Sequence, residues 1–131
     1  MLLDTSGLFS YHDRRDARHG DAVTFFDTAS VRITHSYVLA EFVPLCYTRA
    51  LDRMGALSFV TDLLDNPHVE VVWVDQVLHR VALAFLRSRL DKDYSLCDAV
   101  SFLLMRYRGL SEALTTDRHF SQEGFQRLLK P

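Results

Sequence analysis

The sequence predicts an α/β fold class, a three-layer α/β/α sandwich in which a mostly parallel sheet lies between two layers of helices. Short apolar segments of strand length alternate along the chain with longer segments whose apolar residues recur at helical spacing. The clearest strand, 69–74, reads Val-Glu-Val-Val-Trp-Val and is rich in β-branched residues, as buried strands are. Strands that alternate with helices form a mostly parallel sheet that is covered on both faces. Because the crossovers are right-handed, the topology is limited to a doubly wound, three-layer domain.

The first elements lie close to the amino terminus. We expect a short apolar strand at 1–4 that runs into a polar turn, Asp4–Gly7, because aspartate, serine and glycine are typical turn residues. The apolar residues of segment 19–29 recur at helical spacing and predict a helix. A second short strand is expected at 31–34.

Two consecutive helices are expected in the middle of the chain. Ser36 should cap a helix over 37–51, which Pro44 should kink because proline removes a backbone hydrogen bond. Asp52 should cap the next helix, which ends at Asn66 before a proline. The first helix is expected to face inward with Val38, Phe42, Leu45 and Cys46. The second helix carries Met54, Leu57, Val60 and Leu64 on one side.

The carboxyl-terminal half continues the alternation after the strand at 69–74. Asp75 is expected to cap a helix over 76–90, and a further helix over 95–107 should end at Gly109, since glycine favours the left-handed conformation of a helix end. The last two strands are expected at 112–116 and, more weakly, 125–129.

Composition excludes several classes of protein. Fifteen basic and seventeen acidic residues give a net charge of −2, which argues against a protein that holds nucleic acid by bulk charge alone. The amino terminus does not resemble a signal peptide, and no apolar stretch is long enough to span a membrane. Cys46 and Cys97 are expected to be free thiols in a reducing cytoplasm. Because the sequence contains no linker-like segment, residues 1–131 are expected to form a single domain.

Four carboxylates are candidates for chemistry. Residues that follow parallel strands line the working edge of such sheets, and Asp4 and Asp117 end the first and fourth strands. Asp98 lies in the first turn of its helix, and Glu41 lies in an apolar helical run. Carboxylates gathered in one crevice repel one another, and a divalent cation relieves that cost. Oxygen ligands suit Mg²⁺ or Mn²⁺.

Each acid also has a purely structural interpretation. Asp4 can cap a following helix, and Asp98 fits a capping box with Ser95. Asp117 can be a turn residue, and Glu41 can extend into solvent. From position alone these alternatives stay open, and the joint placement of the four acids favours function.

Four short segments, in order along nearly the whole chain, resemble the acidic motifs of PIN-domain ribonucleases, which include VapC-type toxins. The segments are Leu2-Leu3-Asp4-Thr5-Ser6, Leu39-Ala40-Glu41-Phe42, Ser95-Leu96-Cys97-Asp98-Ala99-Val100-Ser101-Phe102 and Ala113-Leu114-Thr115-Thr116-Asp117-Arg118-His119-Phe120. The resemblance implies a sheet ordered 3-2-1-4-5, a Mg²⁺ or Mn²⁺ cofactor and hydrolysis of RNA. It maps the metal-binding catalytic quartet onto Asp4, Glu41, Asp98 and Asp117.

The same resemblance suggests supporting roles for the hydroxyls of Ser6 and Thr115. Asp93 and His119 are candidates for the rim of the site. We therefore expect a metal-dependent endoribonuclease, plausibly the toxin of a toxin–antitoxin pair, acting on RNA in the cytoplasm as a homodimer with an antitoxin protein as partner. The alternative hypotheses are a catalytically weak or inactive PIN-like module that binds protein or RNA, and a structure-specific DNA nuclease.

Overall fold

Five short parallel strands form the centre of the structure, a computed structural model that describes residues 1–131. Their order in the sheet, β3-β2-β1-β4-β5, confirms the order 3-2-1-4-5. The strands are β1 (Leu2–Leu3), β2 (Ile33–His35), β3 (Glu70–Val72), β4 (Glu112–Leu114) and β5 (Gln126–Arg127). All five predicted strands are therefore present, each shorter than expected.

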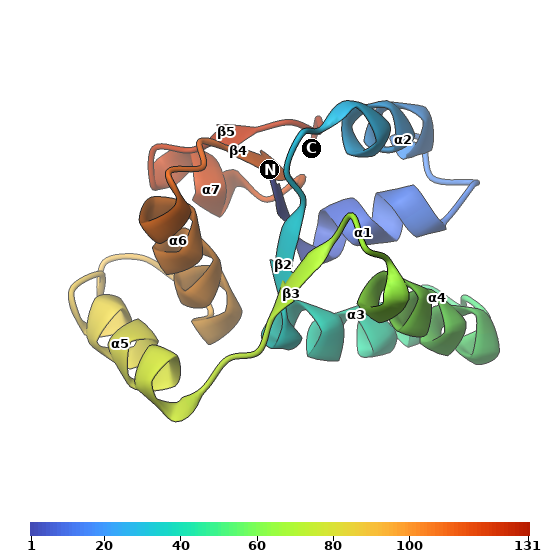
Figure 1. Cartoon of the computed structure of the whole chain (residues 1–131). Coiled ribbons are helices and arrows are strands. Elements are labelled where there is room, and N and C mark those ends of the chain that lie inside the picture. Colours follow the sequence, from blue (N-terminus) through green and yellow to red (C-terminus); the bar gives the residue numbers. More distant parts are fainter.

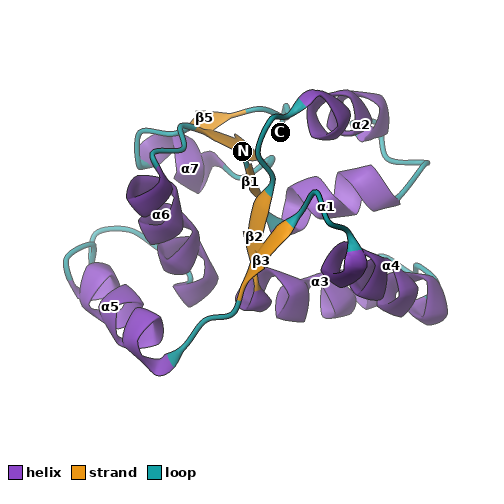
Figure 2. Cartoon of the chain, in the orientation of Figure 1, coloured by secondary structure: helices purple, strands orange, loops and turns teal.

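Seven helices cover the two faces of this sheet. Figures 1 and 2 show α1 to α4 on one side of the strands and α5 to α7 on the other, which confirms the three-layer α/β/α prediction. The helices are α1 (Thr5–His12), α2 (His19–Thr28), α3 (Ser36–Thr48), α4 (Arg53–Asp65), α5 (Gln76–Arg87), α6 (Leu96–Arg108) and α7 (Arg118–Gln122). None of them has both the length and the apolar character that a membrane span requires.

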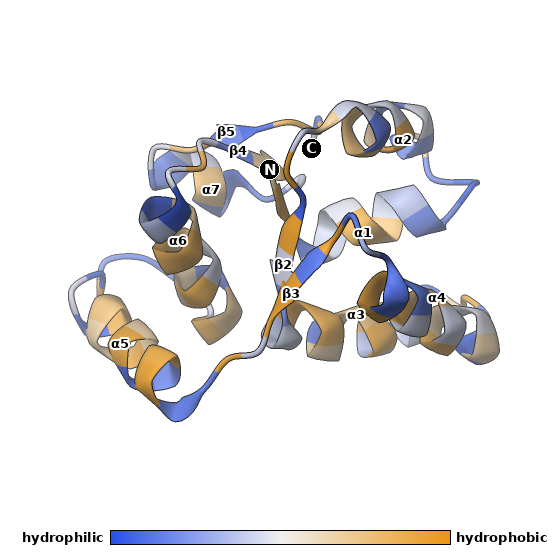
Figure 3. Ribbon diagram, viewed as in Figure 1, coloured by the Kyte–Doolittle hydropathy of each residue, from blue (hydrophilic) through white to orange (hydrophobic).

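The core lies on both sides of the sheet because successive residues of a strand point to opposite faces. In β1, Leu3 packs into the cluster formed with α1 to α4, and Leu2 packs into a cluster with Phe102 and Phe120 on the other face. Both leucines are fully buried. Figure 3 shows apolar residues in β2 and β3 at the centre, and a hydrophilic loop between α1 and α2. Cys46 and Cys97 are buried free thiols.

Several predicted helix ends are confirmed by their capping bonds. The Asp52 carboxylate accepts a hydrogen bond from Gly55 N, and the Asp75 carboxylate accepts one from Leu78 N. Gly109 ends α6 in the left-handed conformation, with φ of 64°. These caps satisfy backbone groups that a helix leaves without a partner at its ends.

The predicted turn at Asp4–Gly7 is wrong, because helix α1 begins at Thr5 directly after Asp4. Gly7 is a packing residue rather than a turn residue: a Cβ atom placed on it would lie 1.8 Å from Leu114 O. Helix α7, only five residues long, was also not expected. Each of these helices starts directly after an aspartate, Asp4 or Asp117, that follows a strand.

The expected burial of α3 and α4 is only partly right. Helix α3 starts at Ser36, so His35 is the N-cap residue, and the Ser36 hydroxyl accepts a hydrogen bond from Val74 N instead. Val38, Phe42 and Cys46 are buried as predicted, whereas Leu45 is half-buried. In α4 the buried residues are Ala56 and Leu63, while Met54, Leu57 and Leu64 are exposed. The apolar stripe predicted for α4 therefore faces largely to solvent.

The buried histidine at the end of β2 is expected to make stability depend on pH. His35 is fully buried, its Nε2 lies 2.8 Å from Ser101 Oγ, and burial lowers its pKa from 6.5 to about 3. Below pH 6.5, His35 therefore binds a proton in the unfolded chain but stays neutral in the folded chain. The free energy of unfolding is unaffected by this difference above pH 6.5 and decreases as the pH falls towards 3.

We therefore expect the free energy of unfolding of the parent to fall by about 2 kcal/mol more between pH 7 and pH 5 than that of His35→Gln. Urea denaturation of both proteins at the two pH values measures this difference. Other groups titrate in the same range, but they are common to both proteins and cancel. Equal losses of stability would contradict the prediction.

Candidate active site

A cavity of about 570 Å³ lies where β1 and β4 end, and all four predicted acids line it. Asp4 comes from the end of β1, Glu41 from α3, Asp98 from α6 and Asp117 from the start of α7. The structure thus brings together residues as far apart in the chain as Asp4 and Asp117, which are separated by 113 positions. Ser6, Asp93 and His119 line the same cavity.

The register between β1 and β4 fixes Asp4 beside Thr115. Leu3 pairs with Leu114, and Asp4 N donates to Leu114 O at 3.2 Å. One residue further, Thr115 Oγ1 donates to Asp4 Oδ2 at 2.7 Å. Because this bond uses the only proton of the Thr115 hydroxyl, the Ser6 hydroxyl must be the donor in its 3.0 Å contact with Thr115 Oγ1.

Ser6 and Thr115 also hold the strand end that leads to Asp117. Ser6 Oγ accepts a hydrogen bond from Thr116 N at 3.0 Å, and Thr115 Oγ1 accepts one from Asp117 N at 3.0 Å. The two hydroxyls therefore connect the Asp4 carboxylate to the backbone of Asp117. These bonds support the predicted roles of the two hydroxyls, which stay a prediction.

Three of the four acids lie at helix amino termini, where the exposed N–H groups favour negative charge. Asp4 is the N-cap residue of α1 but makes no side-chain capping bond, so its carboxylate is available to the cavity. Asp98 shares a capping box with Ser95, and the Asp117 carboxylate accepts a hydrogen bond from His119 N at 2.9 Å. For Asp98 and Asp117 a capping role and a place in the cavity therefore coexist.

Glu41 is oriented by a residue that sequence reasoning missed. Thr5 Oγ1 donates a hydrogen bond to Glu41 Oε2 at 3.2 Å. The only signal for Thr5 was its place next to Asp4, at the end of the first strand. Glu41 is the most exposed of the four acids, but its carboxylate also contacts Thr5 and does not simply extend into solvent.

The acids of the cavity are arranged unfavourably for ionised groups. Burial, followed by the charges of Asp98 and Asp117, raises the pKa of Asp4 from 3.8 to about 7, although the Thr115 hydrogen bond opposes the shift. Burial also raises the pKa values of Glu41 and Asp98. A cation in the cavity would relieve both the desolvation and the mutual repulsion.

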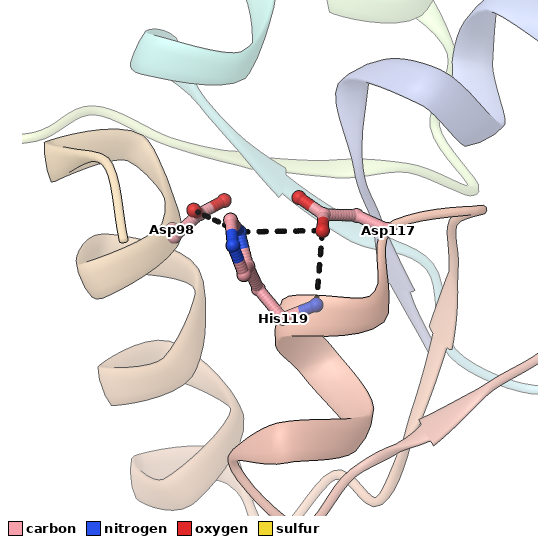
Figure 4. A group of neighbouring side chains, drawn as sticks. All are labelled: Asp98, Asp117 and His119. Atoms are coloured by element: carbon pink, nitrogen blue, oxygen red, sulfur yellow. Dashed lines mark hydrogen bonds and ion pairs between the residues drawn. The ribbon is translucent and has the colours of Figure 1, made fainter. Parts of the chain in front are cut away.

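The tightest group of potential ligand atoms consists of Asp98, Asp117 and His119, whose donor atoms lie within 4.8 Å of one another. Figure 4 shows the two carboxylates turned towards the imidazole from the starts of α6 and α7. Two carboxylates and an imidazole are a donor set that fits a divalent cation. Asp4 and Glu41 line the same cavity without belonging to this group.

The surroundings of His119 differ from those of a surface histidine. Burial alone would lower its pKa, but Asp117, a hydrogen bond to Asp93 and the charge of Asp98 together raise it. The side chain is only 16% exposed. Two of its neighbours, Asp93 and Asp98, come from the loop before α6 and from α6 itself. The spacing of residues along the chain does not reveal these contacts.

Comparison with known proteins identifies the family. The PIN domain family model matches residues 1–125. The chain belongs to the PIN domain family. This PIN domain is 32% identical over 126 residues to the 23S rRNA-specific endonuclease VapC20 in two strains of Mycobacterium tuberculosis, with 95% of each chain covered.

The structural comparison agrees with the sequence comparison. The crystal structure of Mycobacterium tuberculosis VapC20, a toxin that cleaves the sarcin-ricin loop, superposes on this PIN domain with a TM-score of 0.87. The two chains are 31% identical, and 98% of each is covered. The resemblance to the VapC type of PIN domain and the expected PIN-like fold are therefore confirmed.

Proposed function

We propose that this PIN domain is a metal-dependent endoribonuclease and the toxin of a toxin–antitoxin pair. The observation that carries the proposal is the convergence of Asp4, Glu41, Asp98 and Asp117 on one cavity at the carboxyl end of the sheet. The similarity to an rRNA-specific endonuclease over nearly the whole chain supports it. The working unit is the single domain formed by residues 1–131.

The four acids are the proposed ligands of Mg²⁺ or Mn²⁺. When bound, the cation activates water and stabilises the negative charge that develops on the phosphate oxygens. Thr115 and Ser6 hold the Asp4 carboxylate in place through two consecutive hydrogen bonds. Glu41, the most exposed of the four, is the proposed carboxylate that assists deprotonation of the attacking water.

Removal of divalent cations is the first test. We expect the purified chain to cleave an RNA fragment that carries the sarcin-ricin loop, the target of the similar toxin, in the presence of Mn²⁺ or Mg²⁺. Excess EDTA should abolish cleavage and added Mn²⁺ should restore it, and the products should carry a 5′-phosphate and a 3′-hydroxyl. Separation of end-labelled fragments on a gel measures this.

Two outcomes would contradict this proposal. Cleavage that continues undiminished in EDTA would mean that the acids do not act through a cation. A DNA strand of the same sequence, cleaved as fast as the RNA, would favour the DNA-nuclease hypothesis instead.

Exposed apolar residues on α3 and α4 form a surface that a protein partner could cover. On α3 and α4, Tyr47 is 74% exposed, Met54 69%, Leu57 40% and Leu64 42%. We propose that an antitoxin protein covers this surface, that the toxin forms a homodimer, and that both act in the cytoplasm, where cellular RNA lies. The same surface would serve a catalytically inactive binding module. The mass of the purified chain in solution tests the homodimer. The mass of its complex after co-expression with the protein encoded by a neighbouring gene tests the antitoxin partner. The cleavage assay distinguishes an active toxin from an inactive binding module.

A further inference from the structure

His119 is held on both sides of its ring by carboxylates. Its Nε2 lies 2.8 Å from Asp93 Oδ1, and its Nδ1 lies 3.2 Å from Asp98 Oδ2 and 3.3 Å from Asp117 Oδ1. The ring of Tyr94 packs edge-on against the imidazole, with ring centroids 5.2 Å apart and planes at 69°. The imidazole therefore has a fixed orientation, with Nδ1 directed into the group of ligand atoms shown in Figure 4.

Asp93 determines which nitrogen of His119 keeps its proton. An ionised carboxylate can only accept hydrogen bonds, so Nε2 must carry the hydrogen in the 2.8 Å contact with Asp93. Nδ1 faces Asp98 and Asp117, and by the same rule it carries a proton in the metal-free protein. A metal ion would bind in place of that proton, while the Nε2 hydrogen stays bonded to Asp93. A carboxylate that orients a histidine through its outer nitrogen in this way is the usual environment of a metal-binding histidine.

We propose that His119 is a metal ligand of this PIN domain, that Asp93 is its positioning residue, and that the nitrogen ligand makes the site prefer Mn²⁺ to Mg²⁺. Magnesium binds almost only to oxygen, whereas imidazole nitrogen is a good ligand for the transition metals. The inference deepens the proposed function, on which it rests, because it adds a nitrogen to an all-carboxylate site and names the preferred metal. It also gives Asp93 a purpose that an exposed aspartate in a charged loop would otherwise lack.

The geometry has one competing interpretation. The imidazole can act as a resident cation that pairs with Asp93, Asp98 and Asp117, and a metal ion would then bind only after His119 had moved away. In that case no nitrogen would be bonded to the metal. Replacing His119 would then leave the preference between the two metals unchanged or would strengthen the binding of both.

Pulsed electron paramagnetic resonance of Mn²⁺ bound to the full chain separates the two interpretations. We expect the parent to show a nitrogen hyperfine coupling that is lost in His119→Gln. Competition between the two metals, followed by the same spectrum, should show that the preference for Mn²⁺ over Mg²⁺ falls by about tenfold in this variant. Asp93→Asn should weaken Mn²⁺ binding by about 10- to 100-fold. Asp91→Asn, a matched change two residues away on an exposed carboxylate outside the cavity, should bind Mn²⁺ like the parent.

Mn²⁺ bound to the parent without nitrogen coupling, or an unchanged metal preference in His119→Gln, would overturn the inference. If such a parent still cleaves RNA in Mn²⁺, the proposed function stands and only the role of His119 is wrong. A parent that binds no Mn²⁺ and cleaves no RNA would contradict the proposed function as well.

Discussion

Replacing Asp4 by asparagine is expected to lower the rate of RNA cleavage by at least about a hundredfold. Asp4 is 5% exposed, and its carboxylate receives the Thr115 hydroxyl at the end of β1. Asparagine preserves the size of the side chain and can still accept that hydrogen bond, but it removes the negative charge that a divalent cation requires. Initial rates of RNA cleavage in saturating Mn²⁺ measure the effect. Asp65→Asn, the same change on an exposed residue of α4, should cleave like the parent.

The same substitution is expected to leave the metal-free fold at least as stable as the parent. Burial raises the pKa of Asp4 to about 7, so the carboxylate is costly in its charged form. This cost is absent below the ordinary pKa of 3.8, grows as the pH rises to 7 and is then constant. The variant should therefore gain most, relative to the parent, above pH 7. Thermal unfolding in EDTA measures this stability. If the variant were both inactive and less stable than the parent, its lost activity would be explained by a disturbed fold.

Position along a parallel sheet is what made the convergence of Asp4 and Asp117 predictable from the sequence. Asp4 and Asp117 follow strands that prove to be neighbours, and parallel strands direct their carboxyl ends to one edge. The capping-box spacing with Ser95 placed Asp98 in the first turn of its helix, and its assignment to the site came from the resemblance to the PIN-domain motifs. Asp98 has both a capping role and a place in the cavity, and Asp117, for which a turn was the structural alternative, caps α7 and lines the same cavity.

Contacts between distant segments were not predictable in the same way. His119 contacts Asp93 and Asp98 only because α7 packs beside the start of α6, and nothing in the spacing of these residues indicates that packing. The exposed side of α4 illustrates the same limit. Apolar residues recur at helical spacing through Met54 and Leu57, yet the core accepts Ala56 and Leu63. Which apolar side of a helix is buried depends on the neighbouring elements and not on the helix alone.

Replacing Gly7 by alanine is expected to destabilise the fold by more than about 3 kcal/mol. The added Cβ would lie 1.8 Å from Leu114 O and 2.5 Å from Leu114 C, and these backbone atoms cannot rotate away as a side chain can. Helix α1 would have to move away from β4. That movement would separate Ser6 from Thr115 and so disturb the hydroxyls that hold Asp4. Urea denaturation followed by circular dichroism measures the loss.

Gly20→Ala is the matched control, because a Cβ atom at this position in α2 meets no atom within 4 Å. Alanine loses less backbone freedom on folding than glycine does, so this variant should be more stable than the parent by about 0.5 to 1 kcal/mol. Opposite signs for the same chemical change would show that the close contact of α1 with β4, rather than the loss of a glycine, limits stability. If Gly7→Ala unfolds at the same urea concentration as Gly20→Ala, the close approach of α1 to β4 does not hold the site together.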